Sequence, residues 1–273
     1  MVRLFGPLVG LFFAVALLWS FGNGAYSAIS EPAAPTAEHE FHLHPKDVKF
    51  ASDGAFGKFD KQQLQRGFQV YKEVCSTCHS LKHVAFRDLA ALGYSEAEVK
   101  AIAKEWGTKQ PTFDAKTGER AERDNIPSDY FPTVYYAGQG SPPDLSLITK
   151  ARHNGGAYVA SLLTGYQEQP AELLKKFPDA KTPDGLYYNP YFANLNLSMP
   201  APLTGEGQVT YSDGTKATVD QMAQDVSAFL IWTAEPKLDK RKQTGWAVLG
   251  FLLFATVLAY LAKKNVWADK KGE

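Results

Sequence analysis

Cys75-Ser76-Thr77-Cys78-His79 decides the fold of this chain, and its two cysteines are the only ones among 273 residues. Two thiols three positions apart, with an imidazole directly after them, suit covalent haem attachment. The thiols add to two vinyl groups, and the histidine binds the iron from one face. The stretch therefore predicts a c-type haem attached to Cys75 and Cys78, with His79 as an iron ligand.

Other classes of site also use closely spaced cysteines. A disulfide or a thioredoxin-like redox pair does not need His79, and a thioredoxin site opens a helix after a hydrophobic strand. Here a helix-like segment comes before Cys75 instead. A zinc site needs two further ligands, and the sequence holds no second pair of cysteines to supply them. Haem is the interpretation that uses every residue of the motif.

The helix before the motif is expected to pack beside the haem. Asp60 can cap it, and its apolar positions recur at steps of three and four residues up to Cys75. Ser95 opens a capping box for a short amphipathic helix that reaches Trp106. Two more helices are expected, over residues 151–164 and 218–232.

The rest of the haem domain, predicted over residues 56–236, is expected to be loops. Thr108–Pro132 is charged and rich in turn residues, which indicates an exposed loop. Val209–Ala217, with Ser212-Asp213-Gly214 at its middle, predicts a small β-hairpin. The fold class expected is mainly α, a cytochrome c-like haem domain with long loops and one small β-hairpin.

Pro142 and Pro143 predict a stiff extended segment, because each proline fixes its own φ and disfavours helix in the residue before it. A proline carbonyl there is a candidate acceptor for the Nδ1 proton of His79, which would fix the ring and strengthen it as a ligand. A plain loop is the alternative.

Arg152 and Tyr158 are candidates for binding a haem propionate. Guanidinium pairs bidentately with carboxylate, and a phenol donates one hydrogen bond. A surface arginine and a core tyrosine explain the same residues without haem.

The second iron ligand is predicted to be Met199. It lies in the proline-bounded loop Ser198–Pro202, where a thioether far along the chain can fold over the open haem face. Met222 sits on a helix stripe, where methionine normally fills a core, and Met1 is the initiator. His153, or no second ligand, is the alternative. Protein ligands on both faces favour electron transfer over oxygen or peroxide chemistry, and methionine opposite histidine raises the reduction potential.

Composition and charge fit a globular domain with attached segments. Hydrophobic residues make up 45% and aromatic residues 13%, which is enough for a core around a flat apolar cofactor. The whole chain has zero formal net charge, but residues 29–234 hold 20 Lys+Arg against 25 Asp+Glu, a net charge of −5. This argues against binding nucleic acid and suits a basic protein partner, although a merely solvated surface explains it equally.

Residues 1–28 have the layout of a secretory signal peptide. Arg3 precedes a largely apolar run of 12 residues, 8–19, and small or polar residues follow. The run is short for a span of about 20 residues, and an uncleaved anchor is the alternative. Residues 29–55 are expected to be extended. Their histidines are expected to be solvated: His39, His42 and His44.

Residues 245–262 predict one C-terminal transmembrane helix. They form a mostly apolar run of 18 residues, about 27 Å long as a helix and close to the ~30 Å hydrocarbon thickness. Trp246 suits one membrane interface and Trp267 the other. Residues 237–244 are predicted as a basic linker and 263–273 as a cytoplasmic tail.

Several blocks of the chain together resemble the cytochrome c1 family, the membrane-anchored haem subunits of cytochrome bc1 complexes, from about Phe56 to Trp267. They are the lead-in Phe59-Asp60 with residues 64–74, Pro142–Ser146, Ala151-Arg152-His153, Leu163–Tyr166, Asn189–Phe192, Met199-Pro200 and Ala234-Glu235-Pro236.

The resemblance implies a covalent haem on Cys75 and Cys78, with His79 and Met199 axial. It also implies that Arg152 and Tyr158 lie near a propionate and that Pro142 or Pro143 orients His79. The function it implies is one-electron transfer from a Rieske iron-sulfur protein to a soluble or membrane-bound cytochrome c, beside cytochrome b. Membrane lipid surrounds the anchor, and the haem domain faces the periplasm at a bacterial inner membrane. A haem c subunit of another membrane complex, such as an oxidase, is the alternative, and a peroxidase-like haem enzyme is a further one.

Two features depart from the family pattern. Residues 136–140 are shorter than the Ala/Asn/Gly-rich run found in many members, which puts in doubt the contacts on that side of the haem. Gln167 stands where a cysteine is often found, so that loop is expected to be held by packing alone.

Overall fold

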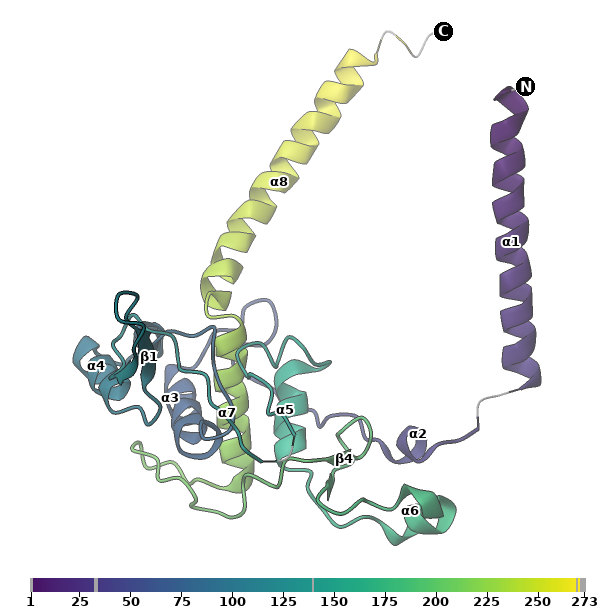
Figure 1. Cartoon of the computed structure of the whole chain (residues 1–273). Coiled ribbons are helices and arrows are strands. Elements are labelled where there is room, and N and C mark those ends of the chain that lie inside the picture. Colours follow the sequence, from purple (N-terminus) through teal and green to yellow (C-terminus); the bar gives the residue numbers. More distant parts are fainter. Residues whose placement is uncertain (1, 32–33, 139, 269, 271–273) are drawn as a thin grey trace.

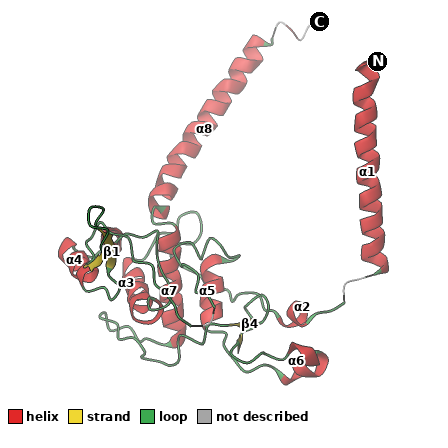
Figure 2. Ribbon diagram, viewed as in Figure 1, coloured by secondary structure: helices red, strands yellow, loops and turns green. Residues whose placement is uncertain are grey.

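The computed structural model describes residues 2–31, 34–138, 140–268 and 270. Helices and loops make up most of this part of the chain, and the strands form two small sheets (Figure 2). The predicted fold class is therefore confirmed in being mainly α-helical.

Three helices form the centre of the domain. In Figure 1, α3 (Lys61–Val70) and α5 (Gly155–Leu163) lie on either side of α7 (Val219–Ala234). Asp60 begins α3 as predicted, because its carboxylate accepts from the backbone N–H of Gln62 at 2.9 Å. The predicted helix over 218–232 is α7, whose first turn is capped by Thr218. Over the predicted 151–164, only 155–163 is α-helical.

The crossing of α3 and α7 depends on Gly67. A Cβ at this position would overlap the backbone carbonyl of Asp225 and lie 2.7 Å from Phe229 Cβ. The neighbouring Arg66 binds the fully buried Asp225 through Nε at 2.9 Å and Asp213 through Nη1 at 2.8 Å. A buried carboxylate needs such a partner, so this pair fixes the side on which α3 meets α7.

Aromatic rings fill the space beside the crossing. Phe68 stacks on Trp106 with centroids 6.3 Å apart and meets Phe229 at 5.6 Å. Tyr71 contacts the same two rings. This cluster includes Met222, which is completely buried on α7 and is core filler, as its position on the helix stripe predicts.

Two short helices complete this side of the domain. The 3-10 helix η2 (Phe86–Leu92) ends at Gly93, whose φ of 105° is one that glycine adopts without strain. Next, α4 (Glu96–Lys104) begins with the predicted capping box, in which Ser95 accepts from the Glu98 N–H and the Glu98 carboxylate accepts from the Ser95 N–H.

The strands do not lie where the sequence predicts. The expected loop Thr108–Pro132 contains an antiparallel hairpin, β1 (Gln110–Phe113) with β2 (Arg120–Arg123). The second sheet pairs β3 (Tyr187–Tyr188) with β4 (Asn196–Leu197).

The predicted hairpin at Val209–Ala217 is wrong. A turn is present, since the Gly214 N–H binds the Tyr211 carbonyl at 3.3 Å. A ladder does not follow, because the Thr210 carbonyl accepts from Gln69 Nε2 at 2.8 Å instead of from a facing strand. Asp213 is likewise drawn to Arg66 on α3.

A smaller cluster lies at the end of the domain away from α8 (Figure 1). It packs α2 (Ala37–Phe41) and α6 (Ala171–Lys176), which is followed by the 3-10 turn η3 (Pro178–Ala180), around Leu173, Tyr188 and Leu195. The expectation of an extended segment over 29–55 is therefore wrong at α2, which Thr36 caps by accepting from the His39 N–H.

Within the described residues, two helices are long and apolar enough to cross a membrane, α1 (Val2–Ser30, its apolar part Leu4–Ser30) and α8 (Leu238–Val266). The helical part of α1 is longer than the predicted apolar run of 12 residues. The basic segment 237–244 is not a separate linker, because α8 begins at Leu238 and includes it. The predicted tail is helical up to Val266, and its residues 269 and 271–273 lie outside the described part.

Gly67→Ala is expected to lower the free energy of unfolding by about 1–3 kcal/mol, because the added methyl forces α3 away from α7. Urea denaturation followed by circular dichroism measures this. Gly107→Ala is the control, since nothing lies within 4 Å of a Cβ there. Equal stability of the two variants would contradict the close approach.

Candidate functional site

The Cys-x-x-Cys-His motif sits at the end of one continuous helical segment. After α3 the chain makes a π-helical turn, η1 (Tyr71–Cys75), closed by a bond of 2.8 Å from the Ser76 N–H to the Tyr71 carbonyl. The N–H groups of Cys78 and His79 then both bind the Cys75 carbonyl, at 3.1 and 2.9 Å. The two thiols and the imidazole are thus held on one tight turn, as haem attachment requires.

His79 makes the contact that the prolines predict. Its Nδ1 lies 2.8 Å from the Pro143 carbonyl oxygen, and Pro142 is the residue before it. When Nδ1 donates there, Nε2 is the nitrogen left for a metal. Burial lowers the pKa of His79, while the Pro143 carbonyl and Asp144 oppose that shift. The ring is therefore neutral near pH 7, the state that binds a metal.

The segment around Pro143, residues 142–146, runs alongside the motif as a strap. The Leu145 N–H binds the Ser80 carbonyl at 2.9 Å, and the Lys82 N–H binds the Asp144 carboxylate at 2.8 Å. Asp144 also accepts from the Ser146 N–H at 3.0 Å, which folds the strap on itself.

Asp144 was not singled out from the sequence as a positioning residue. The sequence does contain a signal for this role. An aspartate favours a local turn, because its carboxylate can accept a hydrogen bond from the backbone N–H two residues later.

Burial raises the pKa values of two side chains in the attachment turn, Tyr71 and Cys75. The Tyr71 hydroxyl donates to the His79 carbonyl at 2.8 Å, and burial raises the pKa of Tyr71. Burial, and next the neighbouring Cys78, raises the pKa of Cys75 to about 12. In the free polypeptide this thiol is protonated at pH 7, which disfavours attack on a disulfide.

Met199 lies on a separate loop that packs against the same core. Cys75, Tyr158 and Met199 are all half-buried against the aromatic cluster described above. The Met199 carbonyl accepts a hydrogen bond of 3.0 Å from the Tyr166 hydroxyl, so the loop is tied to the segment after α5. Gln167 is exposed, and this bond adds to packing in holding the loop. The alternative ligand His153 is exposed at the surface.

Arg152 and Tyr158 lie close to each other. Burial raises the pKa of Tyr158, and the adjacent Arg152 partly opposes this. Arg152 is exposed and donates to the Ala151 carbonyl at 3.1 Å. A cation beside a half-buried phenol is a suitable environment for a carboxylate, and the propionate contact stays a prediction.

The residues present fit a haem. Both cysteines are free thiols, one histidine nitrogen is anchored by a carbonyl, and a thioether loop faces the same core. Among the described residues, no group of three or more His, Cys, Asp or Glu side chains gathers as a metal site, which disfavours the zinc alternative. The three histidines near the N-terminus are exposed, as predicted: His39, His42 and His44. Residues 136–140, the shorter segment that departs from the family pattern, include Gln139, which lies outside the described part of the chain.

Tyr166→Phe is expected to loosen the Met199 loop by about 1 kcal/mol, the usual net worth of one hydrogen bond. In the haem-loaded protein this should make carbon monoxide binding about five-fold more favourable, as measured by absorbance titration. Tyr135→Phe, at a side chain that is 89% exposed, is the control. The same affinity in both variants would contradict a role for Tyr166 in holding the loop.

Comparison with known proteins agrees with this geometry. Residues 50–270 match the Cytochrome C1 family. A cytochrome c1 from Rhodospirillum rubrum is 42% identical over 88% of this chain and 92% of its own length. A cytochrome b/c1 from Bradyrhizobium diazoefficiens is 44% identical over 82% of this chain, which spans only 36% of that longer protein.

A third relative is the mitochondrial cytochrome b-c1 complex catalytic subunit of Candida albicans, which is 39% identical over 90% of this chain and 84% of its own length. Both the identities and the lengths covered are too large for a shared haem motif alone. The chain belongs to the cytochrome c1 family, the electron-transferring haem subunits of cytochrome bc1 complexes.

Proposed function

We propose that this chain accepts single electrons from a Rieske iron-sulfur protein and passes them to a soluble or membrane-bound cytochrome c. The observation that carries the proposal is the anchored His79 ring, whose Nδ1 is 2.8 Å from Pro143 O while Cys75 and Met199 pack against the same core. In this proposal Cys75 is an attachment point for a haem, and His79 and Met199 are its two iron ligands.

The residues have separate tasks. Cys75 and Cys78 would hold one haem covalently, and His79 and Met199 would be the protein ligands of its iron. When bound, haem supplies an iron that takes up and releases one electron. Pro143 keeps the His79 ring in one orientation. Arg152 and Tyr158 offer a cation and a phenol hydroxyl to a propionate.

This set of residues favours electron transfer over catalysis on a small substrate. If His79 and Met199 both bind the iron, no coordination site on it is open to oxygen or peroxide. The strap and the Tyr166 bond keep both ligands in place, which reduces reorganisation between oxidation states. Alone the chain is therefore a carrier, and the oxidoreductase is the whole complex.

The partners follow from the family. The names of two relatives refer to cytochrome b together with c1, which supports cytochrome b as a neighbour of this chain. The acidic balance of residues 29–234, 20 Lys+Arg against 25 Asp+Glu, suits a basic electron acceptor.

The chain is held at a membrane by α8. This helix is 29 residues long, apolar and exposed along most of its length. A haem domain on the periplasmic side of a bacterial inner membrane then leaves the residues after α8 on the cytoplasmic side. The helix α1 is also long and apolar enough to cross a membrane. Both a signal sequence and a membrane anchor have this length and composition.

Met199→Leu tests the second ligand. Removing the thioether is expected to lower the reduction potential and to open the iron to carbon monoxide. A redox titration and a carbon monoxide difference spectrum measure the two effects. Met222→Leu is the control, because this buried α7 residue should change stability by less than about 1.5 kcal/mol and leave the potential unchanged. An unchanged potential in Met199→Leu would show that Met199 is not the ligand.

Salt tests the acidic docking surface. If opposite charges bring a basic cytochrome c to this chain, the rate of acceptor reduction should fall as ionic strength rises from about 0.05 M to about 0.5 M, because the screening length shortens. Stopped-flow absorbance follows the reaction. A rate that is indifferent to salt would remove electrostatic attraction from the proposal.

A further inference from the structure

The loop Ser52–Phe59 is fastened to the first turns of α8. The Lys242 amine donates to the carbonyls of Ser52 at 2.6 Å and Gly57 at 3.2 Å, and the Phe59 N–H binds the Asp239 carboxylate at 3.2 Å. The loop is visible beside the base of α8 in Figure 1. In sequence the loop lies at the start of the haem domain, yet it is held by the helix proposed to cross the membrane.

At the tip of this loop Phe56 stacks on Trp246. The ring centroids are 5.0 Å apart and the planes differ by 7°. Neither ring is buried by the stack, since Phe56 is 79% and Trp246 48% exposed. Exposed aromatic rings at the end of a membrane-spanning helix suit the lipid interface.

The depth of the pair follows from the position of Trp246. It is the second residue of the apolar run 245–262, and tryptophan at the end of such a run lies at the level of the lipid headgroups. Because Phe56 is stacked on this ring, it lies at the same level.

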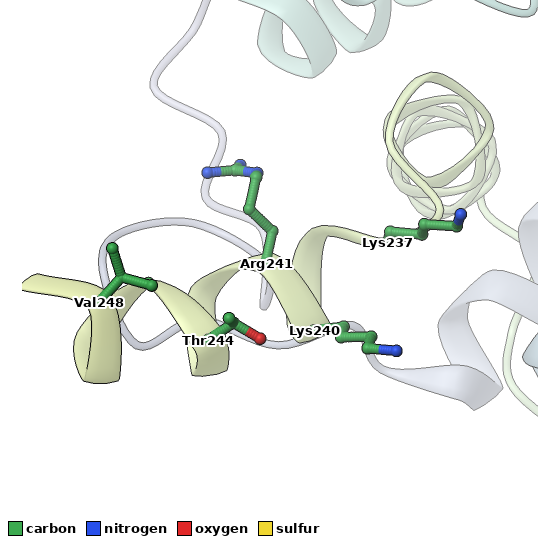
Figure 3. A pocket seen from close by; sticks show the side chains of 6 residues that line it. Lys237, Lys240, Arg241, Thr244 and Val248 are labelled. Atoms are coloured by element: carbon green, nitrogen blue, oxygen red, sulfur yellow. The ribbon is translucent and has the colours of Figure 1, made fainter.

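Charges at the same end of α8, on residues that do not touch the pair, agree with this depth. Lys237, Lys240 and Arg241 line a shallow groove on α8 together with Thr244, Gly245 and Val248. Figure 3 shows the amines of Lys237 and Lys240 on the side away from Val248. Cations on one side and apolar residues on the other mark a boundary between headgroups and acyl chains.

We propose that loop Ser52–Phe59 is a second membrane contact, with Phe56 inserted into the lipid interface beside Trp246. The inference rests on the proposed anchoring by α8. Lipid surrounds the Phe56 ring, because the surface around this ring is continuous with the exposed face of α8. One helix alone leaves a domain free to rotate about its axis, and a second contact removes that freedom.

Site-directed spin labels on the full-length, haem-loaded chain in nanodiscs of phosphatidylcholine and phosphatidylglycerol test this. The thioether linkages consume Cys75 and Cys78, so one added cysteine is labelled uniquely. Ala55→Cys reports on the loop with Phe56 in place. Leu253→Cys, in the middle of α8, is the lipid reference, and Glu172→Cys, on α6 far from α8, is the water reference.

Accessibility to oxygen, relative to a water-soluble nickel chelate, should be several-fold higher at position 55 than at 172 and lower than at 253. Adding Phe56→Asp to Ala55→Cys should bring the ratio to the value at 172, whereas Phe56→Tyr should preserve it, because tyrosine also suits the interface.

A ratio at 55 equal to that at 172, with 253 in lipid, would overturn the second contact and leave the anchor intact. A water-like ratio at 253 would instead overturn the anchor itself, and with it this inference. Protection of position 55 only after assembly with cytochrome b would show a protein partner in place of lipid and would also overturn the proposal.

Discussion

The backbone of α3 touches that of α7 at Gly67, and the rest of the haem domain depends on this approach. Because no side chain separates the helices there, Arg66 reaches the buried Asp225, and the rings of Phe68 and Phe229 meet beside the crossing. The end of α3 is thereby fixed against the core. The π-helical turn that follows carries Cys75 to a set position, so the attachment point is determined by helix packing more than by the loop around it.

The site is assembled from three distant parts of the chain, and each has its own fastening. The attachment turn is held by Tyr71, the strap with Pro143 by Asp144, and the Met199 loop by Tyr166. None of these three side chains belongs to the haem motif. The motif supplies the reactive groups, and the hydrogen bonds around it hold the attachment turn, the strap and the Met199 loop in place.

The sequence predicts the parts of the fold that depend on local rules. Asp60 and Ser95 are found at helix starts because capping is a contact between near neighbours, and Met222 is found in the core because its stripe repeats. Contacts across the chain decide the rest. The turn at Ser212-Asp213-Gly214 is real, yet Gln69 takes the carbonyl that a hairpin would need. The prediction that His79 meets a proline carbonyl was confirmed because prolines leave few conformations open.

The connection between α7 and α8 consists of three residues, Glu235, Pro236 and Lys237. Glu235 is paired with Arg241 and lies 3.4 Å from the Lys150 amine, so the corner is braced on both sides. Such a short, braced joint restrains the angle between the haem domain and α8. If α8 anchors the chain as proposed, the haem would stay near one height above the bilayer, and each electron would have to be delivered and collected by molecules that move.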